Sequence, residues 1–153
     1  VNTRLDQDTL MFSVQFSATI LANTLFQPIV GRISDIYGRK DLILLGFLLL
    51  IPNMILQGFI MSAEYMVILK IIQGISTALV FAPSLALVGD IAEPSNSGTL
   101  LSILTGSFGL GIAIGPTLSG YLYTIGSYST PFISSGILSL IGLLFVWYFV
   151  PKK

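Results

Sequence analysis

Cysteine and histidine are absent from this 153-residue sequence, and charged residues are scarce. Without cysteine no disulfide can form, and without either residue the usual zinc sites and histidine-dependent catalytic triads are excluded. Charged residues make up 9% of the chain, whereas a typical soluble domain carries about 25%. Seven basic and seven acidic residues give no net charge. We therefore expect no catalytic residues, no metal site and no nucleic-acid partner.

The sequence patterns of nucleotide-binding enzymes are missing as well. There is no G-x-x-x-x-G-K-[ST] phosphate loop, which excludes the common ATPase folds. The run G-L-G-I-A-I-G at 109–115 lies inside an apolar stretch, whereas a dinucleotide-binding loop follows a strand. We therefore expect no enzyme activity and no cofactor.

Apolar residues are abundant, at 54% of the chain. A soluble protein of this length could not bury so much apolar surface, which points to lipid as the natural surroundings. A helix needs about 20 apolar residues to cross the hydrocarbon core, and an isolated strand cannot satisfy its backbone there. The sequence predicts an all-α integral membrane fold with five transmembrane helices, at about residues 9–30, 42–61, 65–88, 100–122 and 131–150.

Short connections between these spans require neighbouring helices to alternate in direction. Only Arg4 and Lys70 fall on one side of the resulting topology. The other five basic residues share the opposite side: Arg32, Arg39, Lys40, Lys152 and Lys153. Because basic residues stay on the cytoplasmic side, we expect a multi-pass protein of the plasma or inner membrane, with the 31–40 loop and the C-terminus cytoplasmic. The polar opening after Val1 indicates a piece of a longer chain.

The segment G-R-I-S-D-I-Y-G-R-K at 31–40 is dense in glycine and charge between two apolar spans. Gly38 permits a turn with positive φ, and Gly31 allows another helix to approach the end of the first span. Asp35 can accept hydrogen bonds from a helix N-terminus or pair with a basic residue. Arg39 and Lys40 can bridge to acids or to lipid phosphates. The segment is therefore a candidate latch between helices.

Two acids fall on the same side of the topology as this segment. Asp90 and Glu93 end the third span, where the alternation of direction brings them near the 31–40 loop. We predict that they pair with Arg39 or Lys40.

The 31–40 segment closely resembles the G-x-x-x-D-x-x-G-R-K signature loop of the major facilitator superfamily. The matching residues are Gly31, Asp35, Gly38, Arg39 and Lys40. Ile36 stands where the family commonly has a basic residue, so one ionic contact of the family pattern is not expected. The resemblance implies that the chain supplies five helices of one six-helix repeat. It also implies that the loop is a cytoplasmic gating element, made in one state of a transporter and broken in the other.

The third span carries K-I-I-Q-G at 70–74, which is similar to the R-x-x-Q-G element of the family's fourth helix. Lys70 replaces the usual arginine, and a lysine can lose its proton when buried whereas arginine effectively cannot. The resemblance makes Lys70 and Gln73 candidates for proton coupling or for the substrate path. The alternative for Lys70 is snorkelling to the outer interface, which its place near the start of the span favours.

The fourth span contains G-x-x-x-G-P-x-x-x-G, similar to an element typical of antiporter-type members of the family. Its residues are Gly111, Gly115, Pro116 and Gly120. Ser107 and Ser119 extend the row of small residues along one helix face, which permits close backbone contact. Two interpretations stay open: a helix that bends or slides at Pro116 during transport, and static packing.

Six further polar side chains lie inside the spans: Gln15, Asn23, Gln27, Asn53, Gln57 and Gln73. They line a substrate path or make hydrogen bonds between helices, and base rates favour hydrogen bonding for each one. The chain corresponds to helices two to six or eight to twelve of the family. The 31–40 loop favours the N-terminal half; Lys70 and the basic tail favour the C-terminal half, towards which the balance leans.

The resemblance implies secondary active transport of a small solute by alternating access, in an antiport or efflux mode. The partners would then be the solute, the lipid bilayer and the other half of the transporter. The alternative is a non-transporting membrane scaffold or a receptor-like subunit, which would need the packing glycines but no ionic latch.

Overall fold

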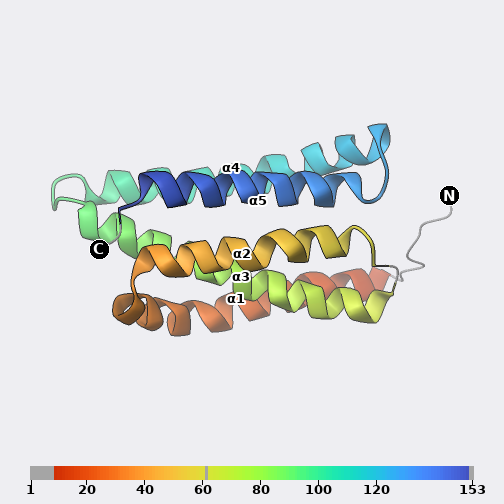
Figure 1. Ribbon diagram of the computed structural model, residues 1–153, viewed down its shortest axis with the longest axis horizontal. Coiled ribbons are helices and arrows are strands. Elements are labelled where there is room, and N and C mark those ends of the chain that lie inside the picture. The colour runs from red at the N-terminus through yellow and green to blue at the C-terminus, as the bar shows by residue number, and fades with distance from the viewer. Residues whose placement is uncertain (1–8, 61, 152–153) are drawn as a thin grey trace.

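Five helices form an antiparallel bundle along the long axis of the molecule (Figure 1). The computed structural model describes residues 9–60 and 62–151. Within these ranges the helices are α1 (Thr9–Tyr37), α2 (Arg39–Gln57), α3 (Ala63–Ile91), α4 (Ser97–Ile125) and α5 (Thr130–Phe149). The all-helical architecture is confirmed. Arg4, Lys152 and Lys153, which contributed to the predicted orientation, and Met61, the predicted end of the second span, lie outside the described residues.

Four of the helices, α2 to α5, are long and apolar enough to cross a membrane by length and composition. Helix α1 has 29 residues but is not among them. It carries Gln15, Asn23 and Gln27 along its length and Arg32 and Asp35 near its end, and these side chains lower its hydropathy. A membrane crossing by α1 therefore stays a prediction.

Helices α1, α3 and α4 extend beyond the spans expected from hydropathy, whereas α2 ends at Gln57, short of the end predicted for the second span. Helix α1 continues to Tyr37 and α2 begins at Arg39, so most of the segment expected to be a loop is helical. Gly38 alone separates the two helices, with φ of 99°. Helix α3 likewise reaches Ile91 and includes Asp90. Hydropathy therefore misses helix ends that are built from polar residues, as at the end of α1 and of α3.

Helix α3 is the centre of the bundle and packs along α1 on one side and α2 on the other. A buried apolar cluster joins the three helices through Val30, Leu42, Ala78 and Leu79. Helix α5 packs against the opposite side of α2, whereas α4 makes few contacts with α3 and α5. In Figure 1, α1, α2 and α3 accordingly lie together, with α4 and α5 along the other side.

Gly74 sets the separation between α1 and α3. A Cβ atom at this position would lie 2.9 Å from the Cβ of Ala22 and 3.0 Å from the backbone nitrogen of Asn23. The amide Nδ2 of Asn23 donates to the Gly74 carbonyl over 3.3 Å. The glycine of the K-I-I-Q-G segment therefore permits a close crossing of two helix backbones, a role that its resemblance to a family motif did not indicate.

Replacing Gly74 by alanine is expected to destabilise the protein by about 1–3 kcal/mol, because the new methyl group meets the α1 backbone and forces the helices apart. Thermal unfolding of the detergent-solubilised protein measures the effect. Gly89→Ala is the matched control on the same helix, since nothing lies within 4 Å of a Cβ there. An equal melting temperature for the two variants would contradict the close-crossing assignment.

Candidate functional site

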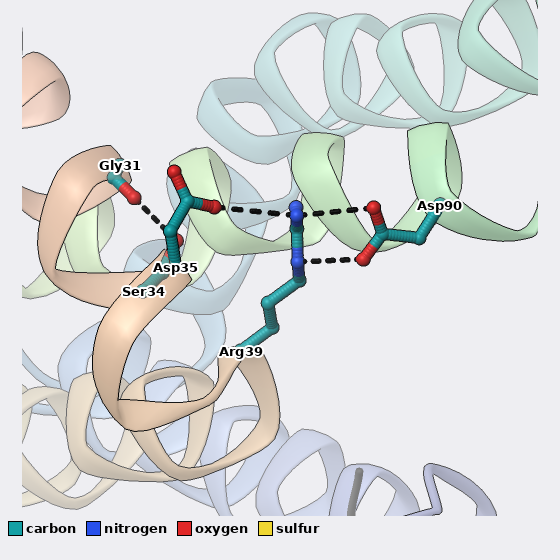
Figure 2. A network of polar contacts seen from close by, with 5 residues as sticks. All are labelled: Gly31, Ser34, Asp35, Arg39 and Asp90. Carbon is teal, nitrogen blue, oxygen red and sulfur yellow. Dashed lines mark hydrogen bonds and ion pairs between the residues drawn. The ribbon is translucent and has the colours of Figure 1, made fainter.

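Asp35 of α1, Arg39 of α2 and Asp90 of α3 meet at one end of the bundle, around the junction at Gly38 (Figure 2). The φ of 99° at this position favours glycine, because a residue with a Cβ atom would be strained in this conformation. The turn allows α2 to start immediately after α1 ends. As a result Arg39, the first residue of α2, reaches between Asp35 of α1 and Asp90 of α3.

Arg39 forms a bidentate salt bridge with Asp90. Its Nε lies 2.7 Å from Asp90 Oδ2, and its Nη2 donates to Asp90 Oδ1 over 3.0 Å. The same Nη2 lies 3.2 Å from Asp35 Oδ1. Planar guanidinium and carboxylate groups suit such paired bonds. The predicted pairing of Asp90 with Arg39 is confirmed, whereas Glu93 uses its backbone N–H to bind Asn96 Oδ1 in the following turn.

Lys40 binds the end of α5, not an acid. Its Nζ donates to the carbonyl oxygens of Trp147, at 2.8 Å, and Val150, at 2.5 Å. The last carbonyls of a helix lack partners within the helix and carry partial negative charge. Helix α5 has no basic residue in its own last turn, so α2 supplies the cation. A bond from a side chain to a backbone 107 or 110 residues away leaves no signal in the sequence.

Gly31 does not have the role predicted for it within this chain. A Cβ atom at Gly31 would meet nothing within 4 Å, so none of the described helices approaches it. Its carbonyl accepts a hydrogen bond from Ser34 Oγ over 2.7 Å (Figure 2). Any close approach at Gly31 must come from atoms beyond the described residues.

An open pocket of about 640 Å³ lies beside the ionic cluster. It is lined by residues 34–41 at the α1–α2 junction, by Leu87, Asp90 and Ile91 of α3, and by residues 149–151 at the end of α5. The pocket places the 31–40 segment and the end of α5 on the same side of the bundle, as the alternation of helix direction predicted. In the described part of the chain, no group of three or more acidic side chains is placed to hold a metal ion.

A second polar cluster lies between α2 and α3, away from the ionic end. Lys70 Nζ donates to Gln73 Oε1 over 3.0 Å, and Gln57 Nε2 donates to the same oxygen over 3.2 Å. The structure thus brings together Lys70 and Gln73, the two candidates for coupling or for the substrate path. Asn53 lies one turn from Gln57 on α2 and is 3% exposed. Both of its amide atoms, and Gln57 Oε1, have no hydrogen-bond partner among the described residues.

Asn23 and Gln27 form hydrogen bonds within α1 and between helices. Gln27 Nε2 donates to Asn23 Oδ1 over 2.6 Å, and Asn23 reaches the Gly74 carbonyl. These bonds tie α1 to itself and to α3. Asn53 is the exception, and composition alone gave no means to separate it from the others.

The glycines of α4 have empty space where a side chain would lie. A Cβ atom at Gly111, Gly115 or Gly120 would meet nothing within 4 Å, and none of the described residues of α4 is buried. The close backbone contact predicted for this face is therefore not made within the described chain. Helix α4 continues through Pro116 to Ile125. Bending or sliding at Pro116 and static packing against atoms elsewhere both stay as predictions.

Comparison with known proteins places these features in a family. The sequence profile described as Major Facilitator Superfamily matches residues 3–153. The chain is 36% identical over 125 residues to the tetracycline resistance protein, class H, of Pasteurella multocida, covering 79% of the chain and 31% of that protein. It is 29% identical over 138 residues to the class B tetracycline resistance protein of Escherichia coli, covering 90% of the chain and 34% of that protein.

A further relative is multidrug resistance protein 3 of Bacillus subtilis, 26% identical over 119 residues, with 78% of the chain and 23% of that protein covered. The chain thus spans about a third or less of the length of these curated relatives.

Lys40→Ala is expected to loosen the last turn of α5, because its carbonyls lose a cationic partner. A loss of about 1 kcal/mol raises the opened population about fivefold. Maleimide labelling of a cysteine introduced at Val150 reports this opening, since the chain has no cysteine of its own. Arg32→Ala is the control, because Arg32 is exposed and forms no ion pair with a described residue. Equal labelling in both variants would show that Lys40 does not hold α5.

Proposed function

The chain belongs to the major facilitator superfamily, and we propose that it forms most of one six-helix half of a secondary active transporter. The transporter would export small solutes, with drugs as the candidate class and protons as the candidate counter-ion. The tetracycline and multidrug resistance proteins among the relatives support the efflux mode. The chain would act as a transporter component and not as an enzyme. It would need the bilayer and the other half of the transporter as partners.

This proposal rests on one observation: Arg39 of α2 forms ion pairs with acids on two other helices. Arg39 extends from the first turn of α2 to acids on α1 and α3, and Lys40 beside it binds the end of α5. In transporters built from repeats, one bundle moves against the other around a site near the membrane midplane. A cluster that joins four helices at one end of the bundle holds that end together while the bundle moves.

Asp35 is the member of the cluster that remains open to a partner. Its side chain is 63% exposed and bonds only one edge of Arg39. The unoccupied approach at Gly31, one helical turn earlier, leaves room for a helix from the other half. We infer that the latch closes when the other half docks against Asp35 and opens when it leaves.

The orientation is part of the proposal. The 31–40 segment and the end of α5 share one end of the bundle, and three of the described basic residues, Arg32, Arg39 and Lys40, belong to that segment. By the positive-inside rule this end is cytoplasmic. The chain would represent helices eight to twelve or two to six, with the first helix of its half supplied by another segment.

The direct test is transport by the complete protein in everted membrane vesicles. With tetracycline and ethidium as probes, we expect accumulation that depends on an imposed pH gradient and stops when the gradient is collapsed. Vesicles lacking the protein are the control. If neither probe accumulates, the efflux proposal for drugs is wrong; if accumulation ignores the pH gradient, proton coupling is wrong.

Asp35→Asn separates the transporter from the alternative, a membrane scaffold or receptor-like subunit. We expect normal insertion and folding with tetracycline accumulation reduced about fivefold, since a lost exposed ion pair is worth about 1 kcal/mol. Size-exclusion chromatography checks folding in the same preparation. Unchanged transport would show that Asp35 is not part of a latch, and failure confined to insertion would give Asp35 a structural role, as the scaffold alternative expects.

The Arg39–Asp90 pair permits a charge-exchange test. Arg39→Asp replaces the shared cation with a third carboxylate beside Asp35 and Asp90 and is expected to reduce accumulation more than Asp35→Asn does, because like charges repel. Adding Asp90→Arg restores an opposite-charge pair and should recover at least part of the transport. A double variant no better than the single one would contradict a role for this pair.

A further inference from the structure

Lys70 is a cation without an anionic partner among the described residues. It lies in α3 with its side chain partly buried, and its ammonium group binds the neutral amide oxygen of Gln73. The acids Asp35 and Asp90 pair with Arg39, in the ionic cluster away from Lys70. The acid of α3 that precedes Lys70, Glu64, lies six residues earlier in the first turn of the helix and is not such a partner. An ionisable group within an apolar span is costly to maintain unless something compensates its charge.

The polar atoms beside Lys70 are incompletely satisfied. Gln57 is fully buried and uses Nε2 to bind Gln73, leaving Oε1 without a partner in the described chain. Asn53, on the same face of α2, has neither a donor nor an acceptor for its amide among the described residues. Each such buried group costs roughly 1–3 kcal/mol. This conformation therefore leaves two acceptors and one donor unpaired. Gln57 Oε1 belongs to a residue that shares the Gln73 oxygen with Lys70, and the two amide atoms of Asn53 lie one helical turn earlier in α2.

The mixture of unpaired atoms indicates what would satisfy them. The unused N–H groups of Lys70 and Asn53 Nδ2 are donors and need acceptor oxygens. A carboxylate supplies such oxygens. The free oxygens of Asn53 and Gln57 call for a donor, which a carboxylate side chain of a protein does not bring. A small organic acid with a hydroxyl, amino or amide group brings both.

We propose that Lys70, Gln57 and Asn53 form a binding site for a small organic carboxylate that also carries a hydrogen-bond donor. Gln73 acts as the positioning residue, because its Oε1 holds both Lys70 Nζ and Gln57 Nε2. The site rests on the proposed transport function. Its amide atoms are enclosed in the present conformation, and a solute reaches them when α2 and α3 separate during the transport cycle.

Binding of 4-hydroxybenzoate to the complete detergent-solubilised protein tests this site. Calorimetry should show saturable binding of 4-hydroxybenzoate, and weaker or no binding of the neutral isostere 4-hydroxybenzamide. Lys70→Gln should weaken 4-hydroxybenzoate binding about tenfold or more, because it removes charge-assisted hydrogen bonds. Lys70→Arg should retain most of the affinity, and Asn53→Leu should reduce it. Arg32→Gln removes a cation elsewhere and should leave it unchanged.

Several results would overturn the site: no binding to the unmodified protein, equal binding of acid and amide, or equal affinity in Lys70→Gln and Arg32→Gln. A carbodiimide cross-link from Lys70 to an acidic side chain of the protein, together with no binding, would identify that side chain as the anion and also overturn it. Tetracycline accumulation without 4-hydroxybenzoate binding would leave the proposed transport function standing. Binding without transport would leave the site standing and remove the transport function.

Discussion

The junction at Gly38 fixes where the charges of three helices meet. Because a single residue with positive φ separates α1 from α2, the first side chain of α2 lies beside the last turn of α1. From there Arg39 reaches Asp35 and Asp90 together. A longer connection would leave the arginine in a mobile loop, where side-chain and backbone entropy oppose an ion pair. The ionic cluster therefore requires the Gly38 turn as well as the charges.

The sequence was sufficient for the parts of this arrangement that follow from topology. Hydropathy located the five helices, and their alternating directions placed Asp90 near Arg39. Hydropathy could not show that α1 runs on to Tyr37, since its final turns are polar. It also could not separate the roles of glycines: a Cβ at Gly74 would press against α1, whereas one at Gly31 or Gly115 would meet nothing within 4 Å. Those distinctions depend on where helices cross, which composition does not encode.

Two polar features also could not be predicted from the sequence. The bonds from Lys40 to the carbonyls of Trp147 and Val150 join a side chain to a backbone, and every residue type has a backbone carbonyl. Asn53 resembles Asn23 in sequence context, yet Asn23 binds the Gly74 carbonyl and Asn53 has no partner in the described chain. The polar residues of apolar helices were recognised as a group, but their individual roles depend on how the helices are placed in space.

Consecutive residues at the start of α2 serve different helices: Arg39 binds α1 and α3, and Lys40 binds α5. Each residue added to an α-helix turns the following side chains by about 100° and advances them by about 1.5 Å. Inserting one residue between Arg39 and Lys40 would therefore turn one cation away from its partner, whatever residue was inserted. Although this stretch lies at the end of the bundle, it should tolerate changes of side chain better than changes of length.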